Sequence, residues 1–162
     1  STVMNQQGFL SEQVEERVAI AYTATGTSAL KSPIYDLGAL GDRGIAFSTI
    51  IATINAGNFV QAYGTNTRPS DGTFANGQYT GSTALTTTIA GSKVQGTTNG
   101  DLVRLDIQNC PYQFVQFEIV RAGATTIAES SRTYLYNASK LPYTAQSTTT
   151  HKRLNAPVLG TP

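Results

Sequence analysis

Hydrophobic and polar side chains alternate along several short stretches of this chain, with a period of two residues. The first stretch follows Arg17, where Val18, Ile20 and Tyr22 alternate with alanines. Such alternation places one set of side chains on each face of an extended strand. The stretch therefore predicts a β-strand, and Thr25–Ser28 after it has the composition of a turn.

The most apolar stretch runs from Gly44 to Asn55, with the sequence GIAFSTIIATIN. A helix would fit the apolar content alone, but the many β-branched residues and the glycines near both ends favour a buried strand. Residues 56–58 (Ala-Gly-Asn) have the composition of a tight turn. We therefore expect a hairpin between this strand and the next one, at residues 59–63.

The second half of the chain repeats the strand pattern at residues 102–107, 112–121 and 131–137, and weaker signals lie at residues 34–37 and 84–90. Residues 64–83 form a long loop rich in Gly, Asn, Thr and Ser. A loop of this length is usually functional or mobile. We expect Phe74 and Tyr79 to fix it to the domain.

Together these segments give seven to nine short strands and no long helix. Short strands separated by loops are typical of a β-sandwich or a jelly roll. The chain has 162 residues, which fits one domain. We expect an all-β sandwich or jelly roll at residues 17–137, between an N-terminal arm at residues 1–16 and a C-terminal tail at residues 138–162.

The two ends lack the alternating pattern. Residues 1–16 are mostly polar, and Ser11 precedes carboxylates that would favour a helix N-terminus. We expect an extended arm that can include one helical turn. Residues 138–162 contain three prolines and no periodic pattern, which predicts an irregular tail.

The composition is unusually poor in charge. Charged residues make up 13% of the chain and the formal net charge is +1. A nucleic-acid-binding protein normally carries a basic stripe, and the sequence has none, so we expect no nucleic-acid partner. No run approaches the length of a membrane span, and the first residues lack the basic and apolar regions of a signal peptide.

Candidate catalytic residues are few. His151 is the only histidine and Cys110 the only cysteine, which is too few for a zinc site. His151 lies in the predicted tail, away from any nucleophile that it could activate. We therefore expect no enzyme activity, no cofactor and no metal.

The acidic residues leave two weaker alternatives open. Asp42 and Asp71 lie in glycine-rich loops, where calcium binding is an alternative to solvated carboxylates, although no EF-hand pattern is present. A glycan-cleaving pair of carboxylates is also conceivable. No sequence feature selects such a pair.

Tyrosines suggest one further alternative. Tyr134, Tyr136 and Tyr143 could form an aromatic platform of the kind that sugar-binding sites use, whereas Tyr134 and Tyr136 could equally pack on one sheet face or a subunit contact. A carbohydrate-binding or adhesion module, with its site here or in the 64–83 loop, is therefore the alternative function.

Two groups of segments resemble a known family. They are Tyr35–Gly38 with the strand from Ile45 to Ile54 and the hairpin to Gln61, and Asp101–Ile107 followed by Pro111–Arg121. Their order, with the long polar loop between them and the proline-containing tail after them, resembles the small β-sandwich capsid decoration (cement) proteins of tailed bacteriophages.

The resemblance implies a structural virion protein, made in the host cytoplasm and bound to the outer capsid surface. The implied partners are the major capsid protein and further copies of this chain, as a homotrimer, with no membrane partner. Extended arms suit such a role because they bury much area per residue when they bind. We expect Phe9, Leu10 and Val14 to be the apolar anchors on the capsid.

Overall fold

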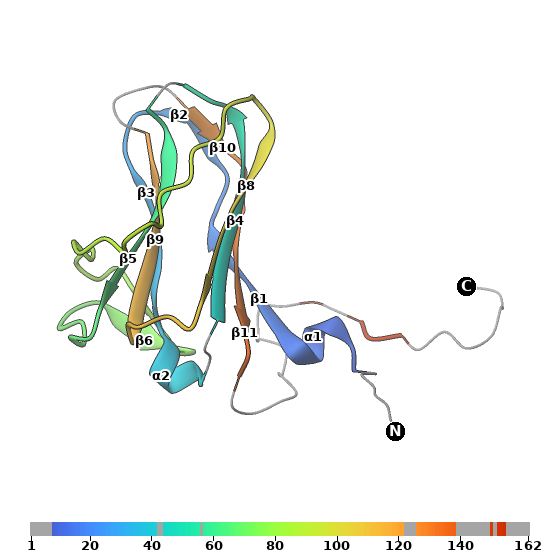
Figure 1. The fold of residues 1–162 in the computed structure, drawn as a ribbon, viewed down its shortest axis with the longest axis vertical. Helices are drawn as coiled ribbons and strands as arrows, with labels where there is room; N and C mark the ends of the chain where they lie inside the picture. Colours follow the sequence, from blue (N-terminus) through green and yellow to red (C-terminus); the bar gives the residue numbers. More distant parts are fainter. Residues whose placement is uncertain are drawn as a thin grey trace, which may run out of the picture.

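The computed structural model describes residues 8–41, 44–55, 57–121, 126–138, 150 and 152–154. It consists of two antiparallel β-sheets that face each other across a common core, and Figure 1 shows them edge-on. This confirms the predicted all-β sandwich. Two helices of four residues each accompany the strands, α1 (Leu10–Gln13) and α2 (Leu37–Leu40).

Sheet A is built around β4 (Gly44–Thr53), which pairs with β8 along one edge. Along its other edge, β4 pairs with β11 over its first half and with β10 near its end. β1 then pairs with β11, and β2 with β10. These partners are β1 (Val14–Ile20), β2 (Thr23–Gly26), β8 (Asp101–Gln108), β10 (Thr126–Ala128) and β11 (Ser131–Tyr136).

Sheet B has the strand order β5-β9-β3-β7-β6. Its strands are β3 (Leu30–Asp36), β5 (Phe59–Thr65), β6 (Thr73–Ala75), β7 (Gln78–Thr80) and β9 (Phe114–Val120). The segment after β7 runs along the outer edge of β5 and touches it through two isolated bridges, Tyr63 to Thr88 and Val60 to Val94.

The predicted hairpin between residues 44–55 and 59–63 is wrong, and the two segments of the second group in the resemblance do not pair with each other either. β4 belongs to sheet A and β5 to sheet B, and β8 and β9 are divided in the same way. The turn residues near Asn58 therefore carry the chain from one sheet to the other instead of folding it back on its neighbour. Turn composition indicates that the chain changes direction, but it does not indicate which sheet the next strand joins.

Several boundaries also differ from the predictions. The first strand begins at Val14, three residues before the predicted domain start, and β2 at Thr23–Gly26 takes in the first two residues of the turn expected at Thr25–Ser28. The 64–83 loop contains the β6–β7 hairpin. In this hairpin Tyr79 is buried, and the centre of its ring lies 4.7 Å from the centre of the half-exposed Phe74 ring. Residues 84–90 form only one bridge.

The core lies between the sheets and follows the predicted alternation. Val115, Phe117 and Ile119 of β9 point into it, and Phe47 of β4 stacks on Phe117 with ring centroids 5.0 Å apart. A second, smaller cluster lies outside this core, on the other side of sheet B, and contains Ile34, Tyr79 and Phe114. Each fully buried side chain of this size contributes about 1.5–3 kcal/mol.

A buried polar cluster closes one end of the sandwich around Asn58, which has no exposed surface. Its amide group donates to the carbonyl of Arg121 at 2.7 Å, and its side-chain oxygen accepts from the backbone of Asn55 at 2.9 Å and from the hydroxyl of Thr126. The Arg121 guanidinium in turn donates to backbone carbonyls of Ala24 and Thr126 at 3.1 Å. These bonds satisfy the backbone where the chain crosses between sheets.

We predict that Asn58→Ala lowers the free energy of unfolding by about 2–4 kcal/mol, because it leaves buried donors and acceptors without partners. Chemical denaturation measures this change. The control is Asn99→Ala, which removes one exposed bond to the backbone of Ile54 and should cost less than about 1 kcal/mol. Equal losses of unfolding free energy in Asn58→Ala and Asn99→Ala would contradict the conclusion that the buried bonds of Asn58 stabilise the fold.

Candidate functional site

The outer face of sheet B is covered by the chain itself. The backbone of Leu85 donates to the side chain of Gln116 at 2.9 Å, and the guanidinium of Arg68 lies 5.3 Å from the centre of the Phe114 ring. Glu118 is buried on this face, where it accepts from Tyr63 at 2.7 Å and pairs with Lys31 at 2.8 Å. This face therefore offers little free sheet surface.

The outer face of sheet A is different, because small residues of β4 lie at its centre. Register places Gly44, Ala46 and Ser48 between side chains of β11 and β8. The Tyr136 ring lies directly over Gly44, where an added Cβ would come within 2.3 Å of it. Its hydroxyl donates to the carboxylate of Asp106 on the far side of β4. Glycine is thus required at position 44 for this close approach.

Exposed apolar side chains lie on the same face. Ile50 and Leu102 are direct register partners and are 41% and 58% exposed, and Val18 on β1 is 69% exposed. Charged residues lie between them, including Glu16 and Arg132, which form an exposed ion pair at 3.1 Å. We call this surface, on β1, β11, β4 and β8, the outer face of sheet A.

The predicted anchors Phe9, Leu10 and Val14 lie at one end of this sheet. Phe9 is the half-buried residue before α1, and its backbone N–H donates to the side chain of Glu12 at 2.9 Å. Leu10 is 76% exposed, and Val14 is the half-buried first residue of β1, opposite Tyr136. Of the three predicted anchors, only Leu10 therefore presents most of its side chain to solvent.

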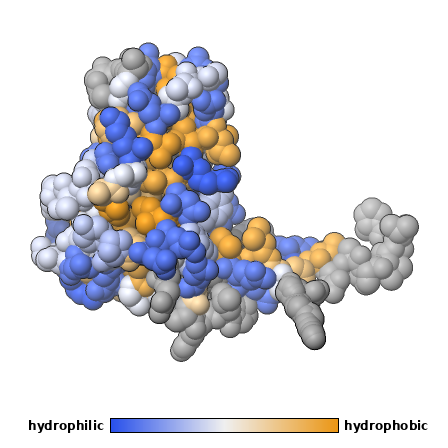
Figure 2. Space-filling view, viewed as in Figure 1, coloured by the Kyte–Doolittle hydropathy of each residue, from blue (hydrophilic) through white to orange (hydrophobic). Residues whose placement is uncertain are grey.

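The helical turn α1 projects from the sandwich (Figure 1). None of its four residues is buried. The described part of the predicted arm, residues 8–16, thus consists of a helical turn that leads directly into β1. Figure 2 shows hydrophobic surface on this projection, beside hydrophilic atoms.

The described part of the C-terminal tail lies against α1, which the sequence did not predict. Arg153 donates from Nε to the hydroxyl of Ser11 at 2.8 Å, across 142 positions of sequence. Leu154 beside it is 66% exposed. The two terminal segments therefore form one projecting unit with exposed Leu10 and Leu154, called the terminal projection below. No alternating pattern marks such a contact, so sequence periodicity had no signal for it.

The residues considered for catalysis or metal binding do not come together. Cys110 is half-buried, and burial raises the pKa of its thiol, which opposes formation of a nucleophilic thiolate. The described residues contain no group of three or more His, Cys, Asp or Glu side chains suited to a metal. His151, Asp42 and Tyr143 lie outside the described residues.

Asp71 holds its own loop together. Its carboxylate accepts from the backbone and hydroxyl of Thr83, at 3.0 and 2.6 Å. These bonds hold the pKa of the Asp71 carboxyl below its ordinary value. The carboxylate therefore closes the segment between β5 and the residues after β7.

In the described part of the chain, no helix is long and apolar enough to span a membrane.

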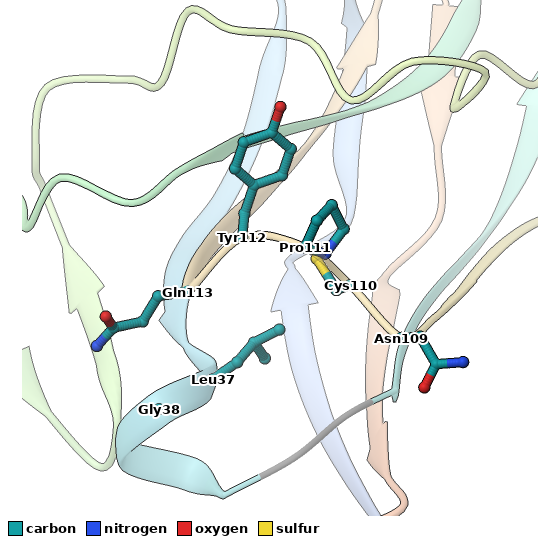
Figure 3. A pocket seen from close by; sticks show the side chains of 7 residues that line it. All are labelled: Leu37, Gly38, Asn109, Cys110, Pro111, Tyr112 and Gln113. Atoms are coloured by element: carbon teal, nitrogen blue, oxygen red, sulfur yellow. The ribbon is translucent and has the colours of Figure 1, made fainter.

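An open groove of about 480 Å³ lies between α2 and the segment that leads into β9. Figure 3 shows that the side chains of Asn109, Tyr112 and Gln113 point in different directions around it. The amide of Gln113 also donates to the buried carboxylate of Asp36 at 3.0 Å. A ligand site normally gathers a few convergent polar groups, and this groove does not.

Tyr134 and Tyr136 share the outer face of sheet A, as residues two apart on one strand do. Both are half-buried. Tyr136 packs over Gly44 and bonds Asp106, so its ring stiffens the sheet. This arrangement favours packing on the sheet face, one of the two alternatives that the sequence left open.

Three tyrosines bind their protons more tightly than usual. Burial raises the pKa of Tyr35, Tyr63 and Tyr136 from 10.0 to about 12, and the acceptor carboxylates of Glu118 and Asp106 add to the effect for Tyr63 and Tyr136. Because these folded-state pKa values lie above the unfolded value, their stabilising contribution is complete below pH 10.0 and is lost as the pH rises toward about 12.

We therefore predict that at least three of the eight tyrosines in the folded protein ionise near pH 12. Near-ultraviolet absorbance of tyrosinate measures the titration, and circular dichroism monitors folding. Tyr136→Phe should remove one late-titrating group. Ionisation of all the tyrosines together near pH 10.0, with the fold intact, would contradict the described burial.

Comparisons with known proteins were made by sequence and by structure. No family model matches this chain, and searches of curated proteins and of solved structures found no significant match.

Proposed function

We propose that this chain is a structural virion protein, a capsid decoration (cement) protein that binds the major capsid protein on the outer surface of the shell. In this role it stabilises the shell across capsomer junctions. It acts by binding and catalyses no reaction. Nucleic acid and membranes are not among its partners.

The terminal projection is the observation that carries the proposal. An isolated helical turn of four residues has too few hydrogen bonds to be stable by itself, so contacts elsewhere have to support it. On this chain those contacts include the Phe9–Glu12 bond at the start of the turn and the Ser11–Arg153 bonds to the tail, and the apolar Leu10 and Leu154 side chains stay exposed. An exposed apolar tip on a rigid sandwich suits insertion into a pocket of another protein.

The low charge of the chain supports permanent assembly. With a formal net charge of +1, long-range attraction or repulsion contributes little to its associations. Short-range packing then determines which partner is bound. This is the situation expected for a protein that sits in a regular shell.

We further infer that the sandwich has jelly-roll connectivity. The short β6–β7 hairpin extends sheet B beyond β3 and is left aside in this comparison. If the segment from Thr88 to Val94 counts as an eighth strand beside β5, sheet A has the order β1/β2, β10/β11, β4, β8 and sheet B the order β3, β9, β5, 88–94. The chain then passes between the sheets as two Greek keys do. This architecture is used by viral capsid proteins and also by lectins, so it supports the class without deciding it.

The alternative of a carbohydrate-binding module has less support. Its two predicted locations were the 64–83 loop and the tyrosines of β11. In the loop, Asp71 is engaged with Thr83, and on β11 the hydroxyl of Tyr136 is engaged with Asp106. The polar groups that are described at these two places are thus already bonded within the chain.

The proposal predicts saturable binding of the purified chain to expanded capsids assembled without it, and no binding to precursor capsids. Leu10→Asp should weaken this binding about tenfold or more, because burial of a leucine contributes about 1.5–3 kcal/mol. Co-sedimentation over a concentration series measures the affinity.

Gln13→Asp is the matched control. It adds the same charge to the same exposed helical turn but removes no apolar group, so it should leave binding within about twofold. Absence of wild-type binding to expanded capsids would overturn the proposal, and specific binding to a glycan array would favour the alternative. Equal losses in both variants would show that α1 binds through charge and not through Leu10.

A further inference from the structure

Strand β8 is a long sheet edge that the described chain leaves unpaired. β4 occupies one side of β8, and none of the described residues forms a strand or bridge along the other. Unpaired N–H and C=O groups along an edge are a template for another strand. Natural proteins usually protect such an edge by a bulge, a proline, charged side chains, shortness or a cover.

The other sheet edges carry such protection. The β1/β2 edge has a register shift between Val18 and Ile20 and an interruption before β2. The β5 edge is covered at Val60 and Tyr63 by the segment after β7. β6, at the last edge, has only three residues.

Of these features β8 has only charged side chains, and the two near its middle, Arg104 and Asp106, have opposite signs. Its eight residues Asp101–Gln108 pair with β4 without a register shift and contain no proline. The outward side chains are all exposed, namely Leu102, Arg104, Asp106 and Gln108. The inward side chains are apolar, namely Val103, Leu105 and Ile107. This is a regular strand with one polar and one apolar face, suited to pairing with a strand of the same pattern.

We propose that β8 of one chain pairs antiparallel with β8 of a second copy, around a two-fold axis at Leu105, so that the two copies of sheet A form one continuous sheet. This register places Arg104 opposite Asp106 of the second copy, and Asp106 opposite Arg104 of the second copy. The strand is therefore complementary in charge to itself. Opposite charges facing each other across a strand pair are stabilising.

The inner face is complementary in the same register. Val103 lies opposite Ile107 of the second copy, and Leu105 lies opposite its own equivalent. Three apolar cross-strand pairs therefore extend the inner faces of the two sheets across the contact. On the outer face, the Tyr136 hydroxyl bonds one carboxylate oxygen of Asp106 and leaves the other for the opposing guanidinium.

Neighbouring registers are disfavoured. Moving the axis by one residue to Arg104 places Arg104 opposite its own equivalent, and moving it to Asp106 opposes two carboxylates. Like charges directly opposite each other destabilise a strand pair. A register in which inward residues oppose outward ones would expose the apolar face, which the period of two forbids.

Such a contact is closed by its symmetry, because each copy uses its one free β8 edge. It gives a dimer, in place of the homotrimer that the resemblance implies. The contact uses none of the residues of the terminal projection. It therefore holds or fails independently of capsid binding.

Charge exchange tests the register. Sedimentation equilibrium should show a dimer for the wild type, and Arg104→Asp or Asp106→Arg alone should raise the dissociation constant at least tenfold. The double variant Arg104→Asp with Asp106→Arg should recover most of the wild-type affinity, because it restores opposite charges in the same register. Glu16→Arg, an exposed change on β1 at the far edge of sheet A, should leave the dimer intact.

A measurement on the wild type supplies a second test that needs no variant. Amide hydrogen exchange in β8 should slow as the protein concentration rises, while the exposed amides of the 64–83 segment should not change. A monomer or trimer at all concentrations, unaltered affinity in the single variants, no recovery in the double variant, or concentration-independent exchange in β8 would each overturn the proposal.

Discussion

The packing of two apolar sheet faces against each other is the constraint on which the rest of this structure depends. Phe47 from sheet A and Phe117 from sheet B stack at its centre. Consecutive strands on opposite sides of this core require the chain to cross from sheet to sheet, and each crossing would bury backbone polar groups without partners. The fully buried Asn58 side chain, together with Arg121 and Thr126, supplies these partners at one end. The polar cluster is therefore a consequence of the layered core, and it specifies where the chain crosses.

The outer faces of the two sheets differ in how far the chain itself covers them. The chain between β5 and β8 folds back over sheet B, where Leu85 and Arg68 lie against the Phe114 cluster on its outer face. No described segment does the same for sheet A, whose outer face keeps exposed Ile50 and Leu102 side chains. The terminal projection leaves the molecule at the end of this same sheet. Of the two surfaces that we propose for partners, one therefore lies on the edge of sheet A and the other at its end.

The two proposals use different parts of that sheet and different physics. Leu10 on the terminal projection offers apolar area for a pocket on another protein, which suits attachment to a shell. β8 offers backbone hydrogen bonds and a self-complementary charge pair, Arg104 with Asp106, which suits pairing with an identical strand. Opposite charges contribute mainly to register here, because exposed ion pairs add little affinity on their own.

The sequence by itself determined the local structure of this protein. The alternation in residues 102–107 and 112–121 predicted β8 and β9 and which of their side chains share a face, because successive side chains of a strand point to opposite faces. It also predicted the all-β class, and it allowed for one helical turn in the N-terminal arm, which the structure has at Leu10–Gln13. Only the tertiary structure decided which strands pair: β4 and β5, which the turn composition had joined in a hairpin, belong to opposite sheets. The contact of Arg153 with Ser11 and the free edge of β8 were likewise decided at this level. They depend on where distant segments meet in space, and a pattern with a period of two residues contains no information about such meetings.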